Sequence, residues 1–357
     1  MSHVYVAGLG AVSPAGWGVA STCKAVCLGS PLADQQLERP GWGKLLRARL
    51  VPNPPQRPAF LAHPRLRRAS PITHYAAAAA LEAWSRPRSL QSGPLQIGVV
   101  ACLQAGCVNY SCRFFGETLK DPQTASPLLF PETVYAAPAS HVTALLENVA
   151  VTYTLVGDPG CYLEGIALAA QWLAEKLVDV CIVFGAEETN WILADALRHL
   201  DGTASLAAGA GALCLCRDPG LSMGVELAAI TDAHTYSAER TRADSARAMR
   251  RQLPSSSSSE LLCDGRGTGV QVNAPETAAW GDWRGMRLSP KRVLGEGLMA
   301  GAAWQCVIAC EALAGGQADA ANVSIVGSNQ QAIGARFLRT PVAEPAMDPS
   351  QKCEVRT

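Results

Sequence analysis

The segment Ser289 to Gln305, SPKRVLGEGLMAGAAWQ, has the residue types and spacing of an active-site frame. Lys291 stands five residues before Glu296, which lies between two glycines, and a run of small residues follows. A lysine and a carboxylate placed in this way could serve proton transfer or bind a substrate. Whether Glu296 is a working acid depends on the other reactive residues of the chain.

A second segment with such residues is RGTGVQVN, which begins at Arg266. Arginine is a permanent cation that can hold an anion, but it cannot exchange protons near neutral pH as histidine does. None of the six histidines lies in either segment; they are His3, His63, His74, His141, His199 and His234. The two segments therefore offer charged groups without an imidazole.

The thirteen cysteines are an odd number, and many stand in apolar runs such as GALCLCRD and WQCVIACEAL. This pattern predicts small buried side chains in a reducing cytosol rather than a disulfide framework. Cys102, Cys107 and Cys112 are five apart, with no CxxC pair and no neighbouring His-x-x-His. We therefore expect no metal site.

Composition excludes several classes of protein. The chain has 357 residues and 48% hydrophobic residues, enough to bury a large core. Thirty basic and thirty acidic residues cancel, so no overall field attracts nucleic acid or an anionic membrane. The N-terminus lacks a signal-like segment, and no stretch of about 18 uncharged apolar residues occurs. We expect a soluble, cytoplasmic protein.

The elements that must position these residues alternate between strands and helices. Predicted strands cover residues 4–12, 95–103, 152–156, 178–188, 209–216, 225–232 and 322–328, and predicted helices cover 73–85, 141–148, 162–177 and 298–313. Thr73 is the expected N-cap of the first helix. This alternation predicts a mostly parallel, buried sheet system in two related halves.

Three regions lack such periodicity. Pro31 to Arg68 is rich in Pro, Arg and Leu and predicts an irregular surface excursion. Thr235 to Ser259 is charged and then polyserine, which predicts a mobile loop or linker. We expect an N-terminal half at 1–220, a C-terminal half at 221–340, and a disordered tail at 341–357.

Several segments, in order along the chain, resemble the β-ketoacyl synthases of the thiolase fold. They are VYVAGLGAVSPAGWGV, SPLLFPETVYAAPASHVTALL, LVDVCIVFGAEE, AAGAGALCL, RGTGVQVNAPE and the segment at Ser289. The resemblance implies an α/β thiolase fold, with two similar βαβαβαββ-type halves in a five-layered α-β-α-β-α arrangement. It also implies acyl condensation by a cysteine at a helix N-terminus, assisted by two histidines.

At the two histidine positions of that family, the chain has other residues. The loop that resembles His-Gly-Thr-Gly-Thr begins with Arg266, and the Gly-His pair after the family lysine is replaced by Gly295 and Glu296. An ionised Glu296 would repel the enolate and the malonyl carboxylate that those histidines stabilise. We therefore expect a Lys291-Glu296 ion pair that fills a vacated site.

The nucleophile and the gating loop also depart from the family. An ungapped match puts the nucleophile position on Pro159, whereas a small shift puts Cys161 there, so a reactive thiolate and a packed helix-start cysteine both remain open. The Gly-Phe-Gly-Gly gating turn is replaced by GSNQQA, which contains Asn329, Gln330 and Gln331.

Two surface features accompany the resemblance. Four aromatic residues near the expected dimer seam could line an acyl tunnel or form plain interface core; they are Phe114, Phe115, Phe130 and Tyr135. The arginines Arg65, Arg67 and Arg68 could meet an acidic acyl carrier protein or form a solvated basic face.

The resemblance and its departures together point to a chain-length factor. Such a subunit does not condense; it forms a heterodimer with an active ketosynthase and shapes the tunnel in type II polyketide or aryl-polyene-like synthesis. We expect an acyl carrier protein as a further partner, no cofactor, and no activity in the isolated subunit. Two alternatives remain: a divergent synthase or acyltransferase that uses Cys161, and an acyl-binding regulator that uses Arg266 or Lys291.

Overall fold

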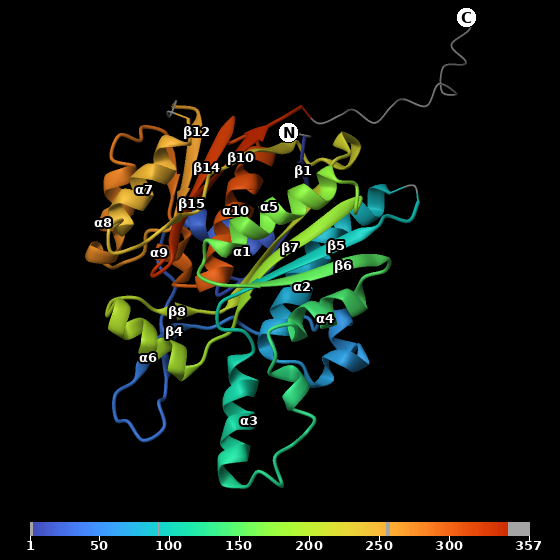
Figure 1. Ribbon diagram of the computed structural model, residues 1–357, viewed down its shortest axis with the longest axis vertical. Helices are drawn as coiled ribbons and strands as arrows, with labels where there is room; N and C mark the ends of the chain where they lie inside the picture. The colour runs from blue at the N-terminus through green and yellow to red at the C-terminus, as the bar shows by residue number, and fades with distance from the viewer. Residues whose placement is uncertain (1–2, 92, 255–257, 342–357) are drawn as a thin grey trace, which may run out of the picture.

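The N-terminal half contains a five-stranded mixed sheet (Figure 1). A computed structural model describes residues 3–91, 93–254 and 258–341. The strands are β1 (Tyr5–Ser13), β5 (Ile97–Leu103), β6 (Val149–Val156), β7 (Val180–Glu187) and β9 (Gly209–Cys216), and their order is β6-β5-β7-β9-β1. The pairs β5-β6 and β5-β7 are parallel, whereas β9 runs antiparallel to both neighbours.

The C-terminal half repeats this topology. Its strands are β10 (Val225–Ile230), β12 (Glu260–Asp264), β13 (Met286–Leu288), β14 (Ala320–Val326) and β15 (Gln331–Arg339), in the order β13-β12-β14-β15-β10. The parallel and antiparallel pairs fall in the same places as in the first sheet. A short antiparallel contact between β1 and β10 joins the two sheets. The strands of the first half end with β9 at Cys216, and those of the second half begin with β10 at Val225. The domain boundary at residue 220 stays a prediction.

Helices form the other three layers. Helix α10 (Leu298–Ala314) packs against strands of both sheets, and α5 (Cys161–Ala174) lies beside it in the central layer. Helices α2 (Pro71–Leu90) and α4 (Ala137–Leu145) cover the outer face of the first sheet, whereas α7 (Arg242–Arg251) and α8 (Val270–Ala279) cover the second. The predicted five-layered α/β arrangement is confirmed.

Helix α10 belongs in the central layer because it is apolar all round. Fourteen of its seventeen residues are buried. The strands beneath it carry glycine where the backbones come close: a Cβ on Gly211 would lie 2.8 Å from the Cβ of Ala303. The Trp304 indole N–H is shared between the carbonyls of Val12 and Ala210, both at 3.0 Å, and so ties α10 to β1 and β9.

The remaining elements are short or peripheral. They are β2 (Gly16–Trp17), β3 (Gln35–Leu37), β4 (Leu46–Arg49), β8 (Leu206–Ala207), β11 (His234–Thr235), α1 (Val19–Leu28), α3 (Val108–Lys120), α6 (Trp191–Leu200) and α9 (Pro290–Leu294), with 3-10 turns at Ala59–Ala62, Pro64–Arg68, Phe130–Glu132 and Pro219–Leu221. Helix α3 extends away from the body at the bottom of Figure 1.

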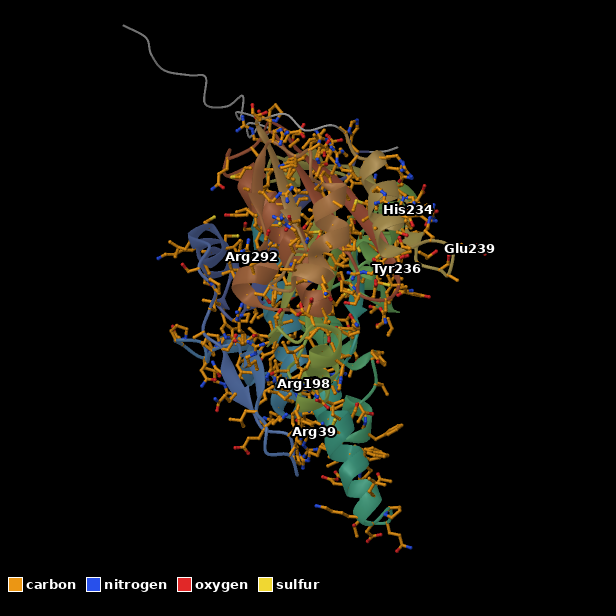
Figure 2. All side chains as sticks on the ribbon, turned by 90° about the vertical axis from the view of Figure 1, so that its left-hand side faces the viewer. Arg39, Arg198, His234, Tyr236, Glu239 and Arg292 are labelled. Atoms are coloured by element: carbon orange, nitrogen blue, oxygen red, sulfur yellow. The ribbon has the colours of Figure 1, made fainter. Side chains whose placement is uncertain are left out.

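The excursion at residues 31–68 is more ordered than predicted. Its strands β3 and β4 join β8 in a small three-stranded sheet. Arg39 and Arg198 lie near one another on this flank (Figure 2), with their guanidinium groups 5.1 and 4.9 Å from the Trp42 ring. The contact from Arg198 holds the excursion against α6, which the lack of periodicity did not reveal.

Several sequence predictions were wrong in detail. The sheets are mixed rather than mostly parallel, because β9 and β15 run antiparallel to both of their neighbours. The stretch predicted as a mobile loop contains α7, which begins with a capping box between Thr241 and Asp244. The first long helix has Ser70 at its N-cap position and includes Thr73. The strand predicted to be last is followed by β15. Residues 255–257 of the serine run, and 342–357 of the expected tail, lie outside the described residues.

None of the helices in the described ranges is both long enough and apolar enough to cross a membrane.

Candidate functional site

Glu296 lies in a tight turn between α9 and α10. The turn depends on Gly295, whose φ of 98° favours glycine. The Glu296 N–H donates to the Ser205 carbonyl at 2.8 Å, and the Ala207 N–H donates to the Glu296 carbonyl at 2.8 Å. Backbone bonds on both sides therefore fix the position of the glutamate, independently of its side chain.

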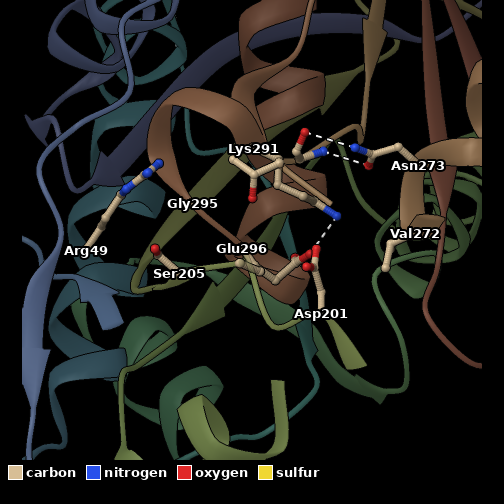
Figure 3. A pocket seen from close by; sticks show the side chains of 11 residues that line it. Arg49, Asp201, Ser205, Val272, Asn273, Lys291, Gly295 and Glu296 are labelled. Carbon is tan, nitrogen blue, oxygen red and sulfur yellow. Dashed lines mark hydrogen bonds and ion pairs between the residues drawn. The ribbon is translucent and has the colours of Figure 1, made fainter. Parts of the chain in front are cut away.

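The Lys291 and Glu296 side chains form the predicted ion pair (Figure 3). Lys291 Nζ lies 2.7 Å from Glu296 Oε2, and the two side chains are 23% and 10% exposed. The other carboxylate oxygen, Oε1, accepts the Leu298 N–H at 3.0 Å. Glu296 thus balances the charge of Lys291 within the protein.

Arg266 is also neutralised from within. Its Nε donates to Asp264 Oδ2 at 2.7 Å, and the Asp264 side chain is fully buried. Ser289 donates to the other oxygen of Asp264 at 2.6 Å, while Arg287 lies 3.6 Å from Oδ2. The role of Asp264 was not predicted, although an acidic residue two positions before Arg266 was a signal for an ion pair.

Glu276 lies behind the same loop and was also missed. It accepts hydrogen bonds from the Gly265 N–H and the Ser324 hydroxyl and is 3% exposed. Burial, with the neighbouring Asp264 charge, raises the pKa of Glu276 to about 7. The rest of the loop keeps a well-defined shape, because the Asn273 side chain forms two 2.9 Å hydrogen bonds with the Gly267 backbone (Figure 3).

In the segment predicted to be the nucleophile elbow, Pro159 and not Cys161 faces a pocket. Pro159 lines a small cavity together with Lys291, Gly327 and Ser328, and Cys161 is absent from its lining. A proline side chain has no nucleophilic atom. The position given by the ungapped match therefore carries no reactive group.

Cys161 instead packs into the core at the start of α5. It is 6% exposed, and a Cβ on Gly157 would lie 2.2 Å from its sulfur. Burial, followed by the nearby Glu164 and Asp158 carboxylates, raises the pKa of the Cys161 thiol to about 12. A thiol of this kind is not ionised at neutral pH, so it is a poor nucleophile.

The loop that replaces the gating turn closes over this elbow. Gln331 is buried, whereas Asn329 and Gln330 are exposed. Gln330 Oε1 accepts the Asp158 N–H at 3.1 Å, and Asp158 Oδ2 accepts the Gln330 and Gln331 N–H groups at 3.2 and 3.3 Å. Asp158, which sequence reasoning passed over within GDPGC, thus connects the elbow to the loop.

The cavities at Pro159 and at Glu296 are small. The cavity at Pro159 has a volume of about 10 Å³, and the one that Arg49, Asp201, Thr268 and Glu296 help to line has about 20 Å³. One water molecule needs roughly 10–15 Å³ measured in this way. Each of these two cavities therefore has room for about one water molecule.

The four predicted tunnel or interface residues lie apart from this site. Phe114 and Phe115 are on α3, and the ring of Phe114 lies 5.6 Å from that of Phe130. Phe115, Phe130 and Tyr135 are 62%, 56% and 42% exposed. None of the four lines the cavities at Lys291 and Pro159.

Across residues 3–91, 93–254 and 258–341, no group of three or more His, Cys, Asp or Glu side chains is arranged to hold a metal ion.

Comparison with known proteins identifies the fold. No protein-family model matches the chain. Nor does any curated protein match it in sequence. Solved structures match nearly its full length, and the chain has the thiolase-like α/β fold of the β-ketoacyl synthases.

Three of these structures are informative. A β-ketoacyl synthase from Burkholderia phymatum STM815 matches with a TM-score of 0.78 and 16% identity, covering 96% of this chain and 100% of that one. A chain of AntDE:AntF, a type II polyketide acyl-carrier protein in complex with its ketosynthase, gives 0.78 and 15%, covering 95% and 99%. A chain of the ketosynthase ApeO with its chain length factor ApeC, from Xenorhabdus doucetiae, gives 0.76 and 13%, covering 95% and 98%.

Proposed function

We propose that this chain is a non-condensing, ketosynthase-like subunit, a chain-length factor, that forms a heterodimer with an active ketosynthase. The observation that carries the proposal is the Lys291-Glu296 ion pair, which puts a carboxylate where an anionic enolate would have to be stabilised. Arg266, at the other expected histidine position, is bound by Asp264. With both cations paired, the acyl-binding regulator that would use Arg266 or Lys291 has no support.

The alternative of a synthase that uses Cys161 is also disfavoured. Its thiol is buried, has a raised pKa, and does not line the cavity that contains Pro159. No imidazole lies in either of the segments that carry Arg266 and Glu296. A thiol without an activating base or an accessible pocket has none of the features on which acyl transfer depends.

Several exposed apolar side chains on the N-terminal half support pairing with another subunit. They are Phe115, Leu119, Leu128, Phe130, Tyr153 and Val156. They lie on α3, on the segment that follows it, and on β6. Strand β6 is the last of its sheet, and in the described residues it pairs only with β5. A free strand edge that carries the exposed Tyr153 is a natural site for another chain to add.

The base of the α3 arm is fixed before any partner arrives. The buried Glu188 carboxylate accepts the Asn109 N–H at 2.8 Å at the start of α3 and the Ile72 N–H at 3.1 Å at the start of α2. A pre-ordered arm loses less entropy on binding. In the heterodimer the proposed role of Phe114 and Phe130 is steric: a growing chain stops when another unit no longer fits.

An acyl carrier protein is the proposed second partner, and the basic face around the 3-10 turn Pro64–Arg68 is its proposed docking surface. Between Glu38 and Glu82 the sequence has no acidic residue. Arg65, Arg67 and Arg68 are exposed, and in the described part of the chain no carboxylate pairs with them. Unpaired arginines favour an acidic partner through complementary charge. The product class, polyene or aromatic polyketide, stays open.

Co-expression with a candidate ketosynthase that retains its Cys-His-His set tests the proposal. We expect a stable heterodimer, and a stable, active homodimer of this chain would refute it. Two leucines of equal exposure provide a matched pair: Leu119→Asp, at 71% on α3, should weaken the heterodimer at least about tenfold, whereas Leu28→Asp, at 72% on α1, should not. Equal effects of the two substitutions on heterodimer affinity would show that α3 is not part of the interface.

A further inference from the structure

The Asp158 carboxylate is held as a bound oxyanion would be. Its Oδ1 accepts the Gly160 N–H at 3.0 Å, and its Oδ2 accepts the N–H groups of Gln330 and Gln331 at 3.2 and 3.3 Å. The residue is 3% exposed, and in the described residues no lysine, arginine or histidine forms an ion pair with it. Three backbone N–H groups from two distant segments are therefore its hydrogen-bond donors. Burial raises the pKa of the Asp158 carboxyl group, and these three hydrogen bonds oppose that effect.

The loop backbone is adapted to approach this carboxylate closely. A Cβ on Gly327 would lie only 1.9 Å from Asp158 Oδ2, so no other residue fits there without displacing the aspartate. On the far side, Tyr236 OH donates to the Gln331 carbonyl at 2.6 Å and Arg242 Nε donates to the Gly327 carbonyl at 3.1 Å. The loop is thus fixed from both sides, with Asp158 as its contact to the elbow.

The chain contains a second copy of the same local turn. Asp218, Pro219 and Gly220 repeat the sequence of Asp158, Pro159 and Gly160. Asp218 Oδ1 accepts the Gly220 N–H at 2.8 Å, as Asp158 Oδ1 accepts that of Gly160. Asp218, however, is exposed and lies on the surface. The local turn therefore does not account for the burial of Asp158, whereas the bonds to Gln330 and Gln331 do.

We propose that Asp158 is the residue that closes this site, acting as an internal oxyanion that holds the loop at residues 327–331 on the elbow. A thioester carbonyl at the elbow would need donors where the Asp158 carboxylate already takes them. The closure is thus a separate device from the Lys291-Glu296 pair. It requires no partner subunit, so it stands or falls independently of the proposed heterodimer.

The test compares Asp158→Ala with Asp218→Ala in the full chain. The melting temperature of Asp158→Ala should be at least about 3 °C lower than that of the parent, because removal of the buried carboxylate leaves three backbone N–H groups without an acceptor. Sodium formate, exchanged for chloride at constant ionic strength, should raise the melting temperature of Asp158→Ala saturably, since formate supplies the missing carboxylate. It should leave the parent and Asp218→Ala unchanged.

A second readout separates closure from mere stability. Cys161 is alkylated in the native protein, and the extent of modification is measured by peptide mass spectrometry. Alkylation should be faster in Asp158→Ala than in the parent, and formate should slow it. An equal formate response in Asp158→Ala and Asp218→Ala, or unchanged Cys161 labelling, would overturn the proposal. If Asp158→Ala is recovered only as aggregate, refolding from urea in formate and in chloride decides the matter, because equal yields would also overturn it.

Discussion

Replacing Lys291 by methionine removes the cation of the central ion pair and keeps most of the side-chain volume. Glu296 would then be a carboxylate that is 8% exposed and has the Leu298 N–H as its remaining side-chain partner. Its backbone bonds to Ser205 and Ala207 would persist, so the charge could not easily move into water. The variant should therefore lose stability without losing the fold.

The size of the loss follows from the geometry. At an effective dielectric constant of about 20, unit charges separated by the observed 2.7 Å attract by about 6 kcal/mol, most of which offsets their desolvation. Removing one partner of a buried pair costs about 3–5 kcal/mol. Since the Lys291 side chain is 23% exposed, water can partly replace it. We expect the lower end, about 3 kcal/mol, in the free energy of unfolding.

Urea unfolding followed by tryptophan fluorescence measures this loss, because Trp304 is buried in α10 close to the site. Arg247→Met is the control, since the Arg247-Asp244 pair is about half exposed and should contribute far less than the Lys291-Glu296 pair. The double variant Lys291→Met/Glu296→Leu should recover much of the loss by removing the unpaired charge. If Lys291→Met lowers the free energy of unfolding no more than Arg247→Met does, the Lys291-Glu296 ion pair does not stabilise the folded protein as proposed.

Three further predictions concern chemistry at the same site. Glu296→His alone should not produce malonyl decarboxylation, because Arg266 stands at the other expected histidine position and the Cys161 thiol is buried; carbon dioxide release from a malonyl thioester would contradict this. Burial raises the pKa of Glu276 from 4.5 to about 7, so the folded state retains a proton that the unfolded chain has lost, and its contribution to stability should decline as pH rises from 4.5 to 7. In urea titrations, Glu276→Gln should reduce the pH dependence of the free energy of unfolding by at most about 1.4 kcal/mol per pH unit. An unchanged slope would show that Glu276 is not the group responsible. Iodoacetamide should label the exposed Cys27 before Cys161, whose pKa is about 12, and faster labelling of Cys161 would revive the synthase alternative.

Much of the fold was predictable because local pattern and tertiary packing agree. Strand Gly209–Cys216 was predicted residue for residue, and helix α10 to within one residue, since both are apolar runs that end at polar or glycine residues. Helix α7 was missed because its residues are mainly charged and it is held by a capping box and one packed face. The small sheet was missed because β3, β4 and β8 come from segments too short to show a period.

The candidate site divides in the same way. The Lys291-Glu296 ion pair could be predicted because the two residues are only five apart in the sequence and Gly295 permits a tight turn between them. Residues this close can meet without any contribution from distant parts of the chain. The carboxylates that complete the site could not all be recognised in this way. Asp158 and the loop at Gln330 and Gln331 are separated by more than 170 residues and meet only because α5 and β15 belong to halves packed across a shared central layer.

The sequence by itself determined the class of fold, the absence of histidine from the segments at Arg266 and Ser289, and the presence of opposite charges at Lys291 and Glu296, because residue identity and short-range spacing decide these. Tertiary structure alone decided that Pro159 faces a cavity while Cys161 turns into the core, and that this cavity has room for about one water molecule. It also decided that Asp158 occupies the N–H groups at the elbow. Burial, cavity volume and the direction of a side chain arise from elements packed against one another, and no local pattern contains them.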